Sequence, residues 1–137
     1  MKLNPYLNFN GRCEEAFKFY EQLLGGKIVD LLTFGGTEAA EFVPAEWRNK
    51  IMHAHLQVGD DDLMGSDGPS PDQYQAPRGL YVSLNVDEPA EAERIFQALA
   101  EGGTVEMPIQ ETFWAARYGS VVDRFGTPWM INCARPA

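Results

Sequence analysis

Two short segments, one in each half of the chain, alternate between apolar and polar residues. They are residues 4–9 and residues 81–86. A period of two residues is typical of a strand with one buried face. Each half of the chain is therefore predicted to begin with a half-buried strand. The apolar positions are Pro5, Leu7 and Phe9 in the first strand and Val82, Leu84 and Val86 in the second.

A helix is predicted after each of these strands, because apolar residues then recur every three or four positions. Gly25-Gly26 follows the first helix and Gly102-Gly103 follows the second, and glycine suits the left-handed turn that ends many helices. A β-branched stretch comes next in both halves. This order predicts an internal repeat at an offset of about 77 residues. The apolar helix positions are Ala16, Phe17, Tyr20, Leu23 and Leu24, then Ala92, Ile95, Phe96 and Leu99.

Strand patterns continue in the rest of each half. Residues 51–58 alternate, so His53 and His55 share one face while Leu56 and Val58 lie on the other. The run Asp60-Asp61-Asp62 is predicted to be a solvated turn before a short strand that starts at Leu63-Met64. In the second half, residues 114–122 and 129–133 are predicted strands with a hairpin tip at residues 123–126, and Trp129 is predicted to be a core residue.

These patterns predict an α+β fold built of two β-α-β-β-β modules. The stretch from Gly65 to Gly79 is rich in Gly, Ser, Asp and Pro, so we expect modules 1–68 and 79–137 joined by a linker at 69–78. Residues 37–50 are a second irregular stretch, with a short helix or a mobile flap. One module alone leaves sheet edges and an apolar face uncovered, so we expect the modules to pack together or against another chain.

Composition narrows the classes of function. The 20 acidic and 11 basic residues give a net charge of -9, which repels phosphate backbones and anionic membranes, so we expect no nucleic-acid and no membrane partner. The chain lacks an apolar run of about 18 residues and its start lacks a signal-peptide pattern, so we expect a cytoplasmic protein. Cys13 and Cys133 are too few for a disulfide framework and are expected to be reduced, partly buried thiols.

Three ordered motifs carry a resemblance to a known family. The first joins Pro5-Tyr6-Leu7-x-Phe9-x-Gly11 to Glu15-Ala16-Phe17-x-Phe19-Tyr20, the second joins Lys50-Ile51-Met52-His53-Ala54 to Leu63-Met64-x-Ser66-Asp67, and the third joins Phe113-Trp114-x-x-Arg117-x-Gly119 to Asp123-x-Phe125-Gly126-x-x-Trp129. Together they resemble PhnB-like proteins of the vicinal oxygen chelate superfamily, which includes glyoxalase I, bleomycin-resistance proteins and extradiol dioxygenases. The resemblance implies curved mixed sheets that enclose a cavity, commonly in a homodimer, and leaves the reaction open.

Some PhnB-like proteins carry a label as ubiquinone-pathway methyltransferases. A nucleoside cofactor would favour a strand that leads into a glycine-rich loop at a helix N-terminus. The loop after the first strand has Gly11 alone, and the two glycine pairs stand at helix C-termini. The residues therefore argue against methyl transfer.

Catalytic members of the superfamily hold a divalent metal with His and Glu side chains on their inner strands. The resemblance places these four ligands at Asn4 or Pro5, at Met64 or Ser66, at Tyr81 and at Met130. None of these side chains is an imidazole or a carboxylate, the groups that such sites need. We therefore predict no cofactor, and a divalent metal is a disfavoured alternative.

His53 and His55 are the remaining candidates for chemistry. In the resembled fold their face would line the cavity, where they could form part of a polar pocket or hydrogen-bond across the sheet. One of them could instead act as a general base near neutral pH. Both could ligate a metal, with Asp67 or Glu41 as a third ligand, although no spacing places either carboxylate there.

Trp114 and Arg117 could form a surface that stacks on a planar ligand and pairs with an anionic group. Alternatively, Trp114 belongs to the core and Arg117 pairs with Asp123 or with another carboxylate. The polar sides of the two initial strands suit a wet cavity, or are simply solvated. The candidate ligand-binding residues are Tyr6, Asn8, His53, His55, Met64, Tyr81, Trp114, Arg117 and Met130.

The sequence thus favours a homodimeric protein that binds a small-molecule ligand and lacks the metal site of the superfamily. The alternative is a lyase, an isomerase or a metal-dependent enzyme that uses His53 or His55. A third interpretation is a purely structural module without a ligand-sized cavity.

Overall fold

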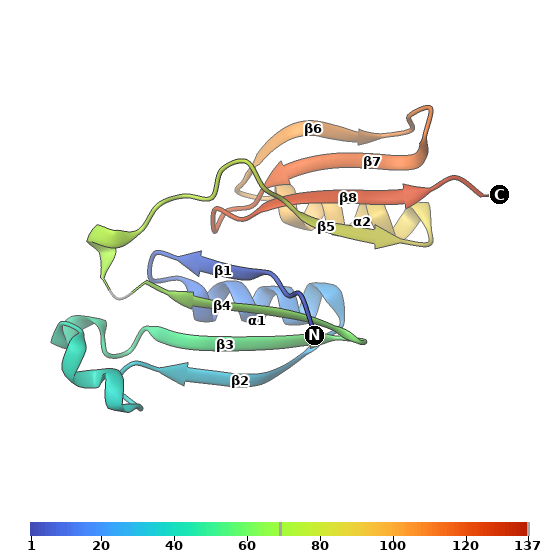
Figure 1. The fold of residues 1–137 in the computed structure, drawn as a ribbon. Helices are drawn as coiled ribbons and strands as arrows, with labels where there is room; N and C mark the ends of the chain where they lie inside the picture. Colours follow the sequence, from blue (N-terminus) through green and yellow to red (C-terminus); the bar gives the residue numbers. More distant parts are fainter. Residues whose placement is uncertain (69, 137) are drawn as a thin grey trace. The chain divides into compact units, whose positions relative to one another are not determined.

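Each half of the chain forms one four-stranded sheet and one α-helix (Figure 1). The computed structural model describes residues 1–68 and 70–136, and it divides into two units, Met1–Gln75 and Ala76–Ala137. Pro69, the first residue of the predicted linker, lies outside the described residues. Within the described part of the chain, no helix has the length and hydropathy needed to cross a membrane.

The first unit has a mixed sheet with strand order β1-β4-β3-β2, in which β1 and β4 are parallel and the other neighbours are antiparallel. Two short 3-10 helices connect β2 to β3, so of the two alternatives for residues 37–50 the short helix is the one observed. A third 3-10 helix follows β4. The elements are β1 Tyr6–Phe9, α1 Cys13–Leu24, β2 Lys27–Thr33, the 3-10 helices Glu38–Phe42 and Ala45–Trp47, β3 Ile51–Val58, β4 Asp61–Asp67 and the 3-10 helix Pro71–Gln73.

The second unit repeats this topology, with strand order β5-β8-β7-β6 and with β5 parallel to β8. Both α-helices have 12 residues, and each packs on its own sheet. The predicted α+β class with two β-α-β-β-β modules is confirmed. The elements are β5 Val82–Val86, α2 Pro89–Ala100, β6 Thr104–Gln110, β7 Ala115–Val122 and β8 Pro128–Ala134.

The core of each unit lies between the helix and one face of its sheet. In the first unit the apolar side of α1 is buried against the strands, as its spacing of three and four predicts. Gly65 of β4 permits a close approach there, because a Cβ atom at this position would lie 2.8 Å from a ring carbon of Phe17 and 2.8 Å from the Leu7 carbonyl oxygen. In the second unit Trp129 is fully buried, which confirms its predicted place in the core.

The hairpin between β3 and β4 differs from the prediction. Its loop contains two residues, Gly59 and Asp60, and Gly59 has the left-handed φ of 60° that such a tight loop requires. Val58 pairs with Asp61, so Asp61 and Asp62 already belong to β4 and are not part of a solvated turn. The strand continues to Asp67, so residues 65–67 are strand residues and not the start of the linker stretch.

A buried carboxylate, Asp67, joins three parts of the first unit. Its Oδ1 accepts hydrogen bonds from the backbone N–H groups of Gly11 (2.8 Å) and Cys13 (3.1 Å), and its Oδ2 accepts one from Ile51 (2.8 Å). The loop after β1, the first turn of α1 and the start of β3 are thus held by one side chain. Burial raises the pKa of Asp67, and the three N–H donors oppose that rise.

Asp123 has a similar structural role in the second unit. Its Oδ1 accepts from the backbone N–H groups of Phe125 (2.9 Å) and Thr127 (3.0 Å), and its Oδ2 accepts from Trp129 Nε1 (2.8 Å). Gly126 has a positive φ of 94° in the same tip. The prediction of a hairpin tip at residues 123–126 is confirmed, and the same aspartate also anchors the largest core side chain.

We expect Asp67→Asn to lower the free energy of unfolding by about 2–4 kcal/mol, because the amide NH₂ cannot accept one of the three buried backbone hydrogen bonds. Urea denaturation would measure this loss. Asp60→Asn is a matched control, because Asp60 is exposed in the β3–β4 loop and should change stability by less than about 0.5 kcal/mol. Equal stability of the two variants would contradict the role assigned to Asp67.

Candidate functional site

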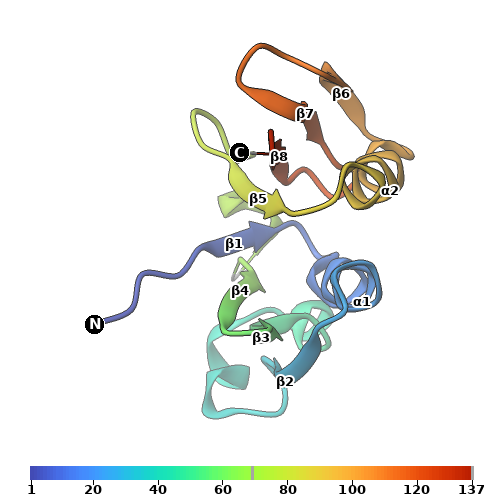
Figure 2. The same ribbon diagram turned by 90° about the vertical axis from the view of Figure 1, so that its right-hand side faces the viewer.

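One face of the first sheet packs on α1, and within the described residues of this unit the other face carries no α-helix (Figure 2). Side chains alternate between these faces, so Ala54 and Leu56 of β3 are buried toward α1 while His53 and His55 lie on the other side. We call this second side the open face. It is formed by Tyr6 and Asn8 of β1, His53 and His55 of β3, and Asp62, Met64 and Ser66 of β4.

Tyr6 and His53 come from strands that are not neighbours, yet their rings stack. The ring centroids are 5.9 Å apart with an interplanar angle of 26°, and Tyr6 Oη lies 3.2 Å from His53 Nδ1. Because β4 lies between β1 and β3, the two rings meet above β4. Met64 of β4 is the register partner of both Tyr6 and His55, and its thioether lies at the centre of this face.

His55 is held by a buried carboxylate. Its Nε2 lies 2.7 Å from Asp62 Oδ1, and the side chain of Asp62 is 4% exposed. The second oxygen of Asp62 accepts a hydrogen bond from the Lys2 ammonium group. These hydrogen bonds, the one from Lys2 first and the one from His55 second, lower the pKa of Asp62. On the other side of the ring, Nδ1 lies 3.9 Å from Asp30 Oδ2 of β2.

Sequence reasoning missed Asp62, because it treated the three consecutive aspartates as one solvated turn. The signal that could have found it is Gly59-Asp60, a residue pair suited to a two-residue hairpin loop. With that loop, the pairing of Val58 with Asp61 places Asp62 opposite Gln57 and diagonal to His55. Diagonal neighbours on one face of a sheet are within reach of long side chains.

Tyr81 and Met130 belong to the second unit. Tyr81 Oη donates a 2.8 Å hydrogen bond to Glu106 Oε1, and this bond raises the pKa of Tyr81. Because Tyr81 precedes β5 and Glu106 is in β6, the bond links the two outer edges of the second sheet. Met130 of β8 pairs with Ser83 on one side and with Ser120 on the other.

The structure does not bring Trp114 and Arg117 together. Trp114 lies just before β7, is 48% exposed and contacts Tyr118 edge-to-face with ring centroids 5.4 Å apart. The Arg117 guanidinium instead donates to Glu93 Oε1 of α2 at 3.0 Å, on the helix side of the sheet. Arg117 thus pairs with a carboxylate, as one interpretation expected, but its partner is Glu93 and not Asp123.

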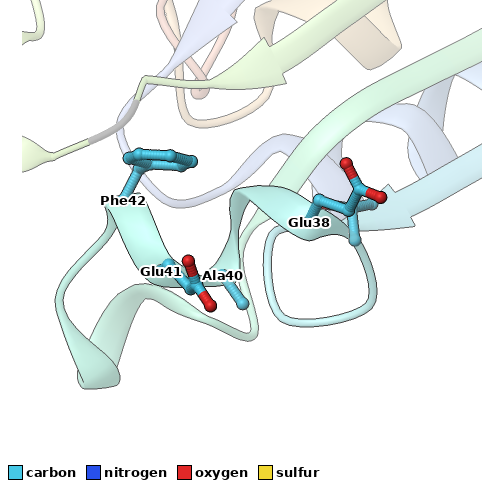
Figure 3. A pocket seen from close by; sticks show the side chains of 5 residues that line it. Glu38, Ala40, Glu41 and Phe42 are labelled. Carbon is cyan, nitrogen blue, oxygen red and sulfur yellow. The ribbon is translucent and has the colours of Figure 1, made fainter.

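A shallow hollow of about 450 Å³ lies on the 3-10 helix Glu38–Phe42 (Figure 3), and none of the predicted ligand-binding residues lines it. Its lining includes two carboxylates, Glu38 and Glu41, and the 82% exposed ring of Phe42. Thr37 caps the helix by accepting a hydrogen bond from the Ala39 backbone N–H at 3.1 Å. The residues that line the hollow all lie between Thr37 and Phe42, so the hollow does not combine groups from distant elements.

The comparisons with known proteins agree with the fold. A family model of the Glyoxalase/Bleomycin resistance protein/Dioxygenase superfamily matches residues 2–131. The chain belongs to this superfamily. Protein YjdN of Escherichia coli (strain K12) is 36% identical over 143 residues, which is 98% of this chain and 97% of YjdN.

Solved structures support the same assignment. Protein PA1353 from Pseudomonas aeruginosa is 51% identical with a TM-score of 0.90, and the match covers 99% of both chains. The PhnB protein from Bacillus cereus, described as a putative 3-demethylubiquinone-9 3-methyltransferase, is 21% identical with a TM-score of 0.83 over 98% of this chain and 100% of that one, a likeness of fold. The superfamily that the three motifs predicted is thus confirmed.

The residues at the superfamily's metal-ligand positions do not fit a divalent metal. The positions that the resemblance assigns to the metal ligands are Asn4 or Pro5, Met64 or Ser66, Tyr81 and Met130, and none carries an imidazole or a carboxylate. The Tyr81 hydroxyl moreover donates its hydrogen bond to Glu106. Zn, Ni, Fe and Mn sites need imidazole or carboxylate ligands. In residues 1–68 and 70–136, no three His, Cys, Asp or Glu side chains come together in a way that could hold a metal ion.

Asp67 and Glu41, considered as a third ligand for the two histidines, are both placed elsewhere. Asp67 is on the helix side of β4, because it is separated from Asp62 by an odd number of strand positions, and both its oxygens accept backbone hydrogen bonds. Glu41 lines the hollow on the 3-10 helix. The structure therefore joins neither carboxylate to His53 and His55.

We expect the contribution of Asp62 to stability to disappear in acid. Its pKa is lower in the folded than in the unfolded chain, so the contribution is present above the unfolded value of about 3.9 and is lost as the pH falls through the lower folded value. Urea denaturation of the wild type and of Asp62→Asn should show a difference in free energy of unfolding at pH 6 that shrinks below about pH 4. A difference that stays constant down to pH 2 would contradict the ion pair.

Proposed function

We propose that this protein binds a small organic molecule on the open face of its first sheet, without the metal centre of catalytic superfamily members. The observation that carries the proposal is that the stacked rings of Tyr6 and His53 lie with His55 and Met64 on one side of the first sheet, a side that no α-helix of the unit covers. Ligand sites commonly combine an apolar floor with a few fixed polar groups. This face has that composition.

The side chains of the open face indicate the shape of the ligand. The stacked rings of Tyr6 and His53 offer a flat aromatic wall, and Met64 offers an adaptable apolar contact. Asn8 and Ser66 lie on the same face, with their side-chain oxygens 3.4 Å apart. A small planar molecule with a polar edge would satisfy these groups best.

A methyl-transfer function, which the printed description of the Bacillus cereus protein suggests for that protein, finds no support in the loop after β1. A nucleoside cofactor would need free backbone N–H groups in a glycine-rich loop. Here the N–H of Gly11 donates to the protein's own Asp67 carboxylate.

The proposal can be tested by mapping a fragment library on the protein by ¹H–¹⁵N NMR. We expect the NMR signals of Tyr6, His53, His55 and Met64 to shift when a fragment binds. Tyr6→Ala should weaken binding about tenfold, because this variant lacks the aromatic wall. Phe42→Ala is the matched control, since it truncates an exposed ring of the same unit that lies in the hollow. This variant should bind within about twofold of the wild type.

Three results would contradict this function. Fragments that shift residues 37–42 would move the site to the hollow, and fragments that shift Trp114 and Tyr118 would move it to the second sheet. If no fragment shifted the signals of any residue in either sheet, the result would favour a purely structural module.

A second candidate function is favoured by the pairing of His55 with Asp62. A carboxylate that orients an imidazole is a recurrent arrangement for general-base catalysis, and it would suit a lyase or an isomerase that removes a proton next to a carbonyl group. Such a reaction needs His55 itself, whereas the binding function needs the whole face.

Exchange of carbon-bound hydrogen in D₂O would test the general base. In a panel of 2-oxo acids, hydroxyketones and 1,3-dicarbonyl compounds, the wild type should accelerate exchange of at least one compound about 100-fold or more. His55→Gln should abolish the acceleration and His53→Gln should retain most of it, because Asp62 contacts His55 alone of the two rings. Exchange rates equal to those of the buffer would exclude the base for the whole panel.

A further inference from the structure

Asp62 is far more enclosed than Asp30, the second carboxylate near His55. The residue is 8% exposed, and each of its oxygens has its own donor, His55 Nε2 at one and the Lys2 ammonium at the other. The donors come from the start of the chain and from β3, so the carboxylate is fixed from two sides. Asp30, the other carboxylate near His55, is 53% exposed in its side chain and lies beyond hydrogen-bond distance.

This enclosure determines which nitrogen of His55 carries hydrogen. A carboxylate without a proton can accept hydrogen bonds but cannot donate one. At neutral pH Asp62 is ionised, since its hydrogen bonds lower its pKa. The short contact of 2.7 Å therefore requires hydrogen on Nε2. In the neutral ring the other nitrogen, Nδ1, then has a free lone pair.

The neighbouring polar groups of the open face are paired with one another, whereas Nδ1 of His55 is not paired with any of them. Tyr6 Oη pairs with His53 Nδ1, and Ser66 Oγ pairs with Asn8 Oδ1. Among the described residues Nδ1 of His55 accepts no hydrogen bond, and the Asp30 carboxylate, 3.9 Å away, is itself an acceptor. The Lys2 ammonium group donates to Asp62, and the negative charges of Asp60 and Asp61 also act on it and help to raise its pKa. This part of the face is rich in acceptors and negative charge.

We propose that Asp62 is a positioning residue that holds His55 with hydrogen on Nε2, and that Nδ1 of His55 together with Asp30 forms an acceptor subsite for a neutral or cationic ligand group that donates hydrogen bonds. The ligand class is a small planar molecule with an N–H or O–H edge, such as an amidine or an amine, and not a carboxylate or a phosphate. The ligand part of this inference rests on the proposed function, whereas the positioning part does not.

The positioning part can be tested without a ligand. Long-range ¹H–¹⁵N correlation of the histidine rings distinguishes protonated from unprotonated nitrogens. In the wild type we expect one His55 species with hydrogen on Nε2 and a slowly exchanging Hε2 signal. In Asp62→Ala we expect this signal to vanish and the ring nitrogens to average between the two tautomers.

Two controls separate positioning from a general disturbance of the fold. His53 should keep its spectrum in Asp62→Ala, and Asp30→Ala should keep the Hε2 signal of His55, because Asp30 does not contact Nε2. A wild-type His55 with hydrogen on Nδ1, or a mixture of tautomers in the wild type, would overturn the assignment whether or not any variant folds.

The ligand class can be tested with a matched pair of probes, benzamidine and benzoate, which have similar size and opposite charge. Benzamidine should shift the His55 and Met64 signals of the wild type at millimolar concentration, and Asp30→Ala should weaken this response several-fold. Benzoate should leave both signals in place.

Shifts with benzoate that equal or exceed those with benzamidine would overturn the acceptor subsite, and so would the absence of shifts with both probes. If other fragments then still bound to Tyr6 and His53, the proposed function would stand and the acceptor subsite alone would fail. If no fragment bound while the tautomer experiment succeeded, the proposed function would fail and the positioning role would stand.

Discussion

The arrangement of the open face depends on the register between β3 and β4. A shift of one residue in a strand moves every side chain to the opposite face. The two-residue loop at Gly59 and Asp60 sets this register, and with it the positions of Asp62 and Met64 beside His55. A loop longer by one residue would place Leu63 on the open face and would direct Asp62 toward the core. The chemistry of the face thus depends on a glycine in the hairpin loop, outside the face itself.

Each unit contains one buried aspartate that accepts three hydrogen bonds, but the two aspartates lie at different places in the repeat. In the first unit Asp67 closes the region around α1 from the last residue of β4, whereas in the second unit Asp123 sits in the loop between β7 and β8. Each carboxylate accepts three hydrogen bonds from buried donors, which would otherwise each cost about 1–3 kcal/mol if left without a partner. The two units therefore share one topology and each contains a buried carboxylate acceptor. That acceptor lies on a strand in the first unit and in a loop in the second.

Apolar periodicity predicted both α-helices and the α+β class, because burial selects the side of each helix that its sequence marks as apolar. Strands β2 and β6 were expected from their β-branched residues instead, and both are largely exposed. Apolar periodicity also placed His53 and His55 on one face. The hydrophobic pattern could not predict Asp62 as a residue of the site. Three consecutive aspartates contain no apolar residue, and the length of the loop decides which of them belong to the strand. The sequence also suggested one surface formed by Trp114 and Arg117, but Trp114 lies before β7 and Arg117 pairs with Glu93 on the helix side of the sheet.

Each unit contains one buried cysteine, Cys13 in the first and Cys133 in the second, and neither is in a disulfide bond. Both side chains are fully shielded, and burial raises the pKa of the Cys13 thiol, so a soluble alkylating reagent can reach either sulfur only after its own unit opens. The chain thus carries an internal reporter in each half. The alkylation rates of the two thiols, followed by mass spectrometry of the separate peptides, would show whether the halves open together or independently.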